Sequence, residues 1–296
     1  MTATWWIVGC GYTGTLLART LVASPGLAKD VTITRRDREV ARALGAALGV
    51  RGERLDLAEL ARHPPRAEPG EQAAPAPPGA LEVPRGAIVV CAAPPGSDPA
   101  GEIRALLAVA REATRIIYLS STGVYGPGHG GWVDEAWPVA PITESGRARA
   151  AAEAALAESS VPWVALRAAG IYGPGRGLVD RIRAGTYRVI GDGTSHVSRI
   201  HVVDLVAAIL GAAATAITGP VNAADDDPAP IGEVADAIAA RIGLPAPPRV
   251  AAAQVSPEIA GMLTADRRIA NRRLRDELGV ALRYPSWRDA LEAELS

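Results

Sequence analysis

The sequence of 296 residues has little lysine, little cysteine and no surplus of charge of one sign. Lys29 is the only lysine, so almost all of the 31 basic residues are arginine. The formal net charge of -1 gives no electrostatic reason to expect binding to nucleic acid or to an anionic membrane. The only cysteines, Cys10 and Cys91, lie in apolar, strand-like segments. We expect them to be buried thiols in a reducing cytoplasm.

Long hydrophobic runs and metal-ligand motifs are also absent. The longest apolar stretch, Val202 to Ile217, is interrupted by Asp204 and is too short to span a membrane. The first residues lead directly into a strand-like segment, without a basic leader. No histidine or cysteine spacing is typical of a metal site. These absences predict a soluble, cytoplasmic protein without a metal, which binds a small molecule rather than nucleic acid or a membrane.

The most informative stretch of the sequence lies at its start. An apolar run over residues 4–8 is followed by Gly9-x-Gly11-x-x-Gly14, and helical spacing of leucines continues to residue 23. Gly9 suits a tight turn, Gly11 lets backbone approach a phosphate, and Gly14 lets helix and strand pack closely. The helix N-terminus would then face a dinucleotide pyrophosphate. The alternative is a purely structural glycine turn. The expected cofactor-binding residues here are Gly9, Cys10, Gly11, Tyr12, Thr13 and Gly14.

The second predicted strand indicates which dinucleotide is bound. It covers residues 30–34 and is followed by Arg35 and Arg36. An acidic residue at this position accepts from the ribose 2′-hydroxyl of NAD, whereas an arginine matches the 2′-phosphate of NADP. Such a charge-assisted contact contributes about 1.5–3 kcal/mol. NADP is therefore expected in preference to NAD. The alternative is a solvated arginine cluster.

Strands alternate with helices through the first half of the chain. Beyond the first two strands we predict helices over 40–48, 103–113 and 147–158 and strands over 53–57, 86–91, 115–120 and 161–167. This order predicts an α/β fold with a doubly wound parallel Rossmann sheet of six strands. Asp56 and Leu57 are expected to flank the adenine. Ala92, Ala93 and Pro94 are expected to lie against the cofactor's phosphates and ribose. The proline-rich residues 64–86 are predicted to be a surface insertion.

The second half has shorter elements. Strands are predicted over 187–190, 197–201 and 221–223, and helices over 203–214 and 231–242. Ser286 begins the last helix with a capping box. We predict a Rossmann domain over 1–170 and a smaller substrate-binding lobe over 171–296, some segments of which return to the sheet.

Three motifs resemble those of the extended short-chain dehydrogenase/reductases, which include NAD(P)-dependent sugar epimerases, dehydratases and reductases. They are Ser-Ser-Thr-Gly-Val-Tyr-Gly at 120–126, Leu-Arg-x-x-Gly-Ile-Tyr-Gly-Pro-Gly-Arg-Gly at 166–177 and Arg-Ile-His-Val-Val-Asp-Leu at 199–205. The resemblance implies that Ser121 is the serine which polarises the substrate oxygen. It also implies cofactor contacts from Ser120, Ala168 and Ile171. A homodimer is a further expectation of the family.

The family's Tyr-x-x-x-Lys pair is missing, because Lys29 is the only lysine and lies near the second strand. The corresponding positions hold Ser145 and Arg149. This chain therefore resembles an atypical branch of the family. Arg149 could hold the nicotinamide ribose, but an arginine stays charged and offers no proton. Ser145 is a poor general acid.

Two tyrosines remain as candidate proton donors. Tyr125 is favoured, and Tyr172 opens a loop that lines the substrate pocket in the family. Tyr125, Tyr172 and Arg176 are the expected substrate contacts, and Arg176 either meets an anionic group or caps the loop. His201, beside Asp204, is expected to tie a strand to a helix rather than to act in catalysis.

Two functions follow from these observations. The first is an NADP-dependent oxidoreductase or epimerase-like enzyme that acts on a carbonyl, alcohol or sugar-like small molecule. The second is a catalytically degenerate protein that binds NADP(H) as a sensor or regulator.

Overall fold

The computed structural model of the chain describes residues 2–63 and 83–295. Most of the proline-rich segment predicted as an insertion, residues 64–82, therefore lies outside the described residues. The chain divides into two compact units. The first comprises residues 1–119 and 151–165, and the second comprises residues 120–150 and 166–296. Residues 120–150 therefore group with the second half of the chain.

The first unit is built from alternating strands and helices. In chain order they are β1 (Ala3–Val8), α1 (Tyr12–Ala23), β2 (Ala28–Arg35), α2 (Arg38–Leu48), β3 (Arg51–Arg54), α3 (Leu57–Arg62), β4 (Ile88–Cys91), α4 (Pro99–Val109), β5 (Arg115–Ser121), α5 (Glu144–Leu156) and β7 (Trp163–Ala168). Three of these elements, β5, α5 and β7, have residues in both units.

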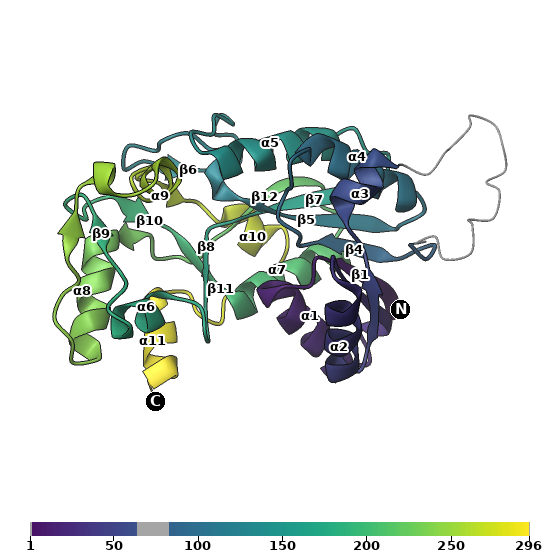
Figure 1. Cartoon of the computed structure of the whole chain (residues 1–296), viewed down its shortest axis with the longest axis horizontal. Helices are drawn as coiled ribbons and strands as arrows, with labels where there is room; N and C mark the ends of the chain where they lie inside the picture. The colour runs from purple at the N-terminus through teal and green to yellow at the C-terminus, as the bar shows by residue number, and fades with distance from the viewer. Residues whose placement is uncertain (1, 64–82, 296) are drawn as a thin grey trace. The chain divides into compact units, whose positions relative to one another are not determined.

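These strands form a central sheet in the order β12-β7-β5-β4-β1-β2-β3. β1 pairs in parallel with β2 and β4, and the β2–β3 and β4–β5 pairs are also parallel. In Figure 1, α1 and α2 cover one face of this sheet, and α3 and α4 cover the other. The structure thus confirms the predicted Rossmann fold. It corrects the number of strands from six to seven, because β12 (Gly219–Ala223) joins the edge beside β7.

The β-branched and aromatic residues of β1 explain its central position. Trp5, Trp6, Ile7 and Val8 are all buried, as expected for a strand with neighbours on both sides and helices on both faces. Trp6 belongs to a core cluster with residues of β4, α4 and β5. This packing fixes the end of β1, from which the glycine-rich turn starts.

Acidic N-caps explain where the predicted boundaries were wrong. The Asp37 carboxylate accepts from the Val40 amide at 2.9 Å, so α2 begins at Arg38 instead of residue 40. Asp56 likewise accepts from the amides of Ala58 and Glu59 at 3.0 and 3.3 Å. Residues 53–57 therefore do not form one strand: β3 ends at Arg54 and α3 begins at Leu57.

The second unit has shorter elements around two core clusters. They are η1 (Thr122–Val124), β6 (Trp132–Val133), β8 (Gly170–Tyr172), α6 (Leu178–Arg183), β9 (Val189–Ile190), β10 (His196–Val197), β11 (Arg199–His201), α7 (Val202–Ala214), β13 (Ala229–Pro230), α8 (Ile231–Arg241), β14 (Arg249–Val250), η2 (Ala252–Gln254), α9 (Pro257–Leu263), β15 (Arg268–Ile269), α10 (Arg272–Asp276) and α11 (Trp287–Leu295).

Small two-stranded pairs tie these segments together. β8 pairs in parallel with β11, β14 with β9, and β15 with β6, whereas β10 and β13 are antiparallel. Half of the capping box predicted at Ser286 is present, since its amide donates to the Asp289 carboxylate at 3.0 Å and α11 follows. The Oγ of Ser286 accepts from the Arg288 amide at 3.1 Å instead of from the Asp289 amide. Among the described residues, no helix has both the length and the apolar character that a membrane span requires.

Candidate functional site

The glycine-rich turn after β1 has the geometry that a phosphate-binding loop needs. Gly9 has a φ of +73°, and a Cβ at this position would lie only 2.5 Å from Cα of Ala93, in the loop after β4. A Cβ on Gly14 would meet Cγ2 of Ile7 at 3.2 Å, so α1 packs closely on β1. Gly11 is the N-cap of α1 and supplies no side-chain cap. The first amides of α1 are therefore not capped by a side chain, and such amides suit an anion.

The non-glycine residues of the turn differ in their orientation. The Cys10 side chain is fully buried, and burial raises the pKa of its thiol. The Cys10 amide donates to the Thr34 carbonyl at 2.9 Å, which anchors the turn to β2. Thr13 is buried and Tyr12 is half-buried. Because the Cys10 thiol faces the interior, Cys10 can contribute to a ligand site only through its backbone.

Arg35 lies beside this turn. It is the last residue of β2, and its Nη1 atom is 3.8 Å from the position of a Cβ on Gly11. The Arg35 side chain is half-buried, and no ion pair formed by residues 2–63 and 83–295 includes it. Arg36 is exposed. The two arginines therefore differ, and Arg35 is the one placed to contact a group bound at the glycine turn.

Two predicted adenine contacts have other roles. The Asp56 carboxylate caps α3 through the two amides described above. Leu57 is 8% exposed and belongs to the core cluster that contains Trp6. It begins α3, a helix that the sequence did not predict, so its side chain turns inward and the adenine contact stays a prediction. In the loop after β4, Ala92 and Ala93 are half-buried and Pro94 is exposed.

In the second unit, Ser121 lies at the end of β5 and caps η1. Its Oγ accepts from the Gly123 amide at 3.0 Å. A Cβ on Gly146 would clash with the Gly123 carbonyl oxygen, so the first turn of α5 packs directly on this loop. Ser145 is exposed and its hydroxyl donates to Glu258, whereas Arg149, one turn further along α5, is half-buried. Ser120, next to Ser121, is buried.

Tyr125 is enclosed by protein partners. Its side chain is 0% exposed, and its hydroxyl donates to Oδ1 of Asn222 at 2.8 Å and accepts from Nη1 of Arg167 at 2.9 Å. The Arg167 guanidinium also stacks over the ring, 4.8 Å from its centroid. A hydroxyl that is buried and already hydrogen-bonded to two side chains argues against the expected role of Tyr125 as a proton donor and substrate contact. Its place within the motif at 120–126 gave no signal of this burial.

We expect Tyr125→Phe to lower the free energy of unfolding by about 1–3 kcal/mol, because it leaves the buried Asn222 and Arg167 without this partner. Chemical denaturation of the variant and the wild type measures the change. A variant of unchanged stability that had lost turnover would contradict this structural role and restore Tyr125 as a proton donor.

The other tyrosine candidate, Tyr172, ends β8 and is half-buried. Its hydroxyl is buried without a hydrogen-bond partner among the described residues, and burial raises the pKa of its phenol above the ordinary value. Arg176 follows on an exposed loop closed by two backbone hydrogen bonds with Gly173. Ala168 ends β7 and is buried, whereas Ile171 is half-buried. Of the two candidate tyrosines, Tyr172 is thus the one whose hydroxyl has no hydrogen-bond partner in the described part of the chain.

His201 has the structural role expected of it. Nδ1 of its ring accepts from the Val203 amide at 3.3 Å and caps α7. Burial and the nearby Arg283 lower the pKa of His201 to about 4, so the ring is neutral at pH 7. The Asp204 carboxylate accepts from the amides of Arg283 and Tyr284 at 2.7 and 3.0 Å. Both side chains therefore hold the backbone in place.

Sequence reasoning missed a set of buried polar residues in the second unit. The atoms Nη2 of Arg199, Oδ2 of Asp225, Oη of Tyr187 and Nε1 of Trp287 are buried without a hydrogen-bond partner among the described residues. Leaving such a group unpaired costs about 1–3 kcal/mol. Burial raises the pKa of Asp225 to about 8 and lowers that of Arg199. The only sequence feature that pointed to this set is that Arg199 begins the motif at 199–205.

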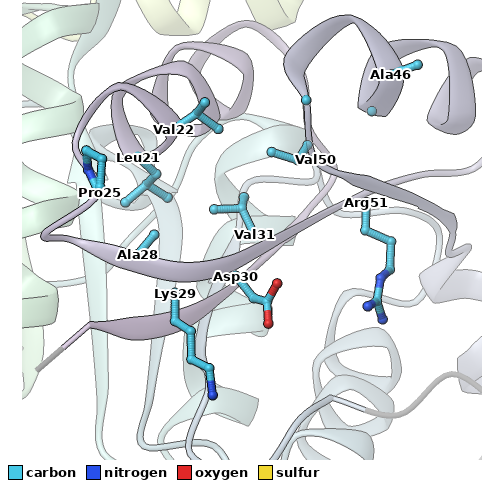
Figure 2. A pocket seen from close by; sticks show the side chains of 12 residues that line it. Leu21, Val22, Pro25, Ala28, Lys29, Asp30, Val31, Ala46, Val50 and Arg51 are labelled. Carbon is cyan, nitrogen blue, oxygen red and sulfur yellow. The ribbon is translucent and has the colours of Figure 1, made fainter.

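A separate pocket of about 620 Å³ lies in the first unit (Figure 2). Leu21, Val31 and Val50 provide apolar walls, and Lys29 and Arg51 extend from the starts of β2 and β3. The glycine-rich turn follows the other end of β1, so this pocket is not part of the turn. The described residues also contain no group of three or more His, Cys, Asp or Glu side chains that could hold a metal ion.

Comparisons with known proteins agree with this geometry. Residues 99–224 match the model of the NAD dependent epimerase/dehydratase family. A curated relative, the 3-diazoavenalumate denitrifying reductase of a Streptomyces species, is 36% identical over 123 residues. That match spans 40% of this chain and 40% of the relative's length.

Two solved structures match almost the whole chain. A conserved protein of unknown function from Silicibacter pomeroyi is 30% identical, with a TM-score of 0.79 over 99% of this chain and 98% of its own. The human epimerase family protein SDR39U1, solved with NADPH, shares the fold at 18% identity, with a TM-score of 0.75 over 98% of both chains. This chain therefore belongs to the NAD-dependent epimerase/dehydratase family of extended short-chain dehydrogenase/reductases.

Proposed function

We propose that the protein is an NADP-dependent oxidoreductase or epimerase-like enzyme of an atypical branch of its family. Membership of the family supports a nicotinamide dinucleotide as the cofactor. The observation that carries the choice of NADP is the Arg35 guanidinium, which lies beside the glycine turn and is in no ion pair of the described residues. A planar guanidinium binds a phosphate through two parallel hydrogen bonds.

The residues of the first unit fit a dinucleotide. The amides at the start of α1 would bind the pyrophosphate, and Arg35 would bind a phosphate on the adenosine ribose. Ala92 and Ala93 have no bulky side chains that would keep a ligand from the backbone. When bound, NADPH supplies hydride for the reduction of a carbonyl group.

The second unit would supply the groups that hold the substrate. Ser121 would donate a hydrogen bond to the carbonyl oxygen, and Arg149 would bind the nicotinamide ribose. Since Tyr125 is enclosed and no Tyr-x-x-x-Lys pair exists in the sequence, the reaction lacks the family's activated tyrosine. General acid catalysis contributes about 10²–10⁴-fold to a rate. We therefore expect slow turnover by the standard of the family.

The substrate is a small molecule with a carbonyl or alcohol group. The curated relative is named as a reductase, which supports reduction over epimerisation. The test is NADPH oxidation, followed by absorbance, with a panel of aldehydes, ketones and sugar nucleotides. We expect turnover with at least one substrate, and a loss of about tenfold to a hundredfold in kcat for Ser121→Ala, because one hydrogen bond to the developing oxyanion is removed.

A second function is favoured by one observation, the missing catalytic pair. A protein that binds NADP(H) but has lost the tyrosine and lysine could act as a sensor of the cofactor. Tight NADPH binding without oxidation on the whole panel would favour the sensor and contradict the enzyme. Turnover that Ser121→Ala leaves unchanged would contradict the role given to Ser121.

A further inference from the structure

Five polar side chains gather around one face of the β8–β11 pair. In this parallel pair His201 is opposite Tyr172 and Arg199 is opposite Gly170, so Arg199, His201 and Tyr172 share a face. The rings of Tyr172 and His201 meet edge to face, 5.2 Å apart. The Asp225 amide donates to the Arg199 carbonyl at 2.7 Å, which places Asp225 beside Arg199.

Two further residues come from the apolar cluster on the same side of the unit. Tyr187 and Trp287 belong to one core cluster, and Tyr172 packs against it. Trp287 begins α11, which contacts β11. Burial raises the pKa of the Tyr172 and Tyr187 phenols, and the positive charge of Arg199 acts on both in the opposite direction. The five side chains therefore come from β8, β11, α11 and two loops, and Arg199 lies close enough to Tyr172, Tyr187 and Asp225 for its charge to act on them.

Every one of these residues has a polar atom without a partner. The atoms are Oη of Tyr172, Oη of Tyr187, Nη2 of Arg199, Oδ2 of Asp225 and Nε1 of Trp287, and none has a hydrogen-bond partner among the described residues. The side chains of Arg199, Asp225, Tyr187 and Trp287 are 6%, 1%, 3% and 4% exposed. Natural proteins rarely leave even one such atom unpaired, so five in one cluster indicate a polar group that is absent from the chain itself.

The balance of donors and charge indicates the chemistry of that group. Arg199 and Trp287 can only donate, and both phenols can donate, whereas Asp225 offers the single carboxyl oxygen. No carboxylate of the described residues lies within the 4.0 Å of an ion pair with Arg199, whose Nη1 donates only to the Val197 carbonyl. A buried cation surrounded by donors is complementary to an anion. A carboxylate has one negative charge and about four acceptor positions, which match the four donors, one of which is the guanidinium.

We propose that Tyr172, Tyr187, Arg199, Asp225 and Trp287 form a subsite for a carboxylate group of the substrate. The proposal rests on the proposed function only in that the carboxylate belongs to the molecule that is reduced. Tyr172 is half-buried and opens the exposed loop that carries Arg176, so it lies at the outer edge of the cluster. The burial of Asp225 favours its protonated form, which then donates to the carboxylate as well.

The test uses benzoate as the probe, with benzamide and benzyl alcohol as neutral probes of similar shape. Intrinsic tryptophan fluorescence and the thermal unfolding midpoint are followed without cofactor. We expect benzoate to bind at least tenfold more tightly than either neutral probe. Arg199→Gln should weaken benzoate binding at least tenfold, and Tyr187→Phe and Trp287→Phe should each weaken it about threefold or more. Arg188→Gln, which changes an exposed arginine next to Tyr187, should leave benzoate binding unchanged.

Equal affinities for benzoate and benzamide would overturn the proposal, as would the absence of saturable benzoate binding. In the second case, ordered waters between Arg199 and Asp225 in a crystal structure would show that the cluster holds only solvent. If Arg199→Gln does not fold, the Tyr187→Phe and Trp287→Phe variants still decide the matter, since each retains its aromatic ring. NADPH affinity measured on the same variants should stay unchanged, so that failure of this subsite is distinguishable from failure of the proposed cofactor.

Discussion

Replacing Arg35 with alanine is expected to weaken NADPH binding about tenfold or more and to change NADH binding little. The Arg35 guanidinium lies beside the glycine turn, with Nη1 3.8 Å from the Cβ position of Gly11. A hydrogen bond to a charged group contributes about 1.5–3 kcal/mol, and each 1.4 kcal/mol is about a tenfold change in affinity. NADH has no 2′-phosphate, so it gains nothing from the arginine. Fluorescence titration of both nucleotides measures the change.

Arg36→Ala is the matched control, because Arg36 is the neighbouring arginine but is exposed. It should alter NADPH affinity by less than about threefold, since an exposed ion pair contributes only about 0–1 kcal/mol. If Arg35→Ala weakened NADPH and NADH equally, Arg35 would support the turn rather than recognise a phosphate. If Arg36→Ala produced the larger loss of NADPH affinity, Arg36 would be the residue that recognises the 2′-phosphate.

The second large effect is expected at Gly9. Gly9→Ala would put a Cβ 2.5 Å from Cα of Ala93 at a φ of +73°, so the turn after β1 must separate from the loop after β4. The positive φ costs about 1–2 kcal/mol, and the forced movement of packed backbone costs about 1–3 kcal/mol more. We expect the free energy of unfolding to fall by about 2–5 kcal/mol and NADPH binding to be lost. Chemical denaturation and NADPH titration measure the two effects.

Gly49→Ala is the control that separates the cost of a positive φ from the cost of the steric clash with Ala93. Gly49 has a similar φ of +69°, but no atom lies within 4 Å of its Cβ position. The substitution should lower the free energy of unfolding only by the cost of placing alanine at a positive φ, about 1–2 kcal/mol. NADPH binding should stay intact. Equal effects at Gly9 and Gly49 would show that the contact with Ala93 does not shape the turn.

The local patterns of the sequence were enough to predict the Rossmann fold. The apolar run before Gly9 and the leucine spacing after it are short-range signals, and both appear in the structure as β1 and α1. The seventh strand was not predicted in the sheet, because the pairing of residues 219–223 with a strand some fifty residues earlier is decided by tertiary packing rather than by local pattern. Boundaries were missed where Asp37 and Asp56 act as N-caps.

The functional residues likewise divide into those that a local pattern predicts and those that depend on distant parts of the chain. The proximity of Arg35 to the glycine turn could be inferred from its place at the end of a strand. The burial of Tyr125 could not, because it depends on Asn222 and Arg167, which are 97 and 42 residues further along the chain. The cluster around Arg199 was missed for the same reason, since its members come from five separate segments. Because almost all basic residues of this chain are arginine, the residue type alone does not identify Arg199 as part of a binding site.

The choice of cofactor is tested by the affinity of the wild-type protein for NADPH and NADH, measured in the same buffer by fluorescence titration. We expect NADPH to bind about tenfold or more tightly than NADH, as one charge-assisted contact to the 2′-phosphate requires. Equal affinities, or tighter binding of NADH, would contradict the choice of NADP.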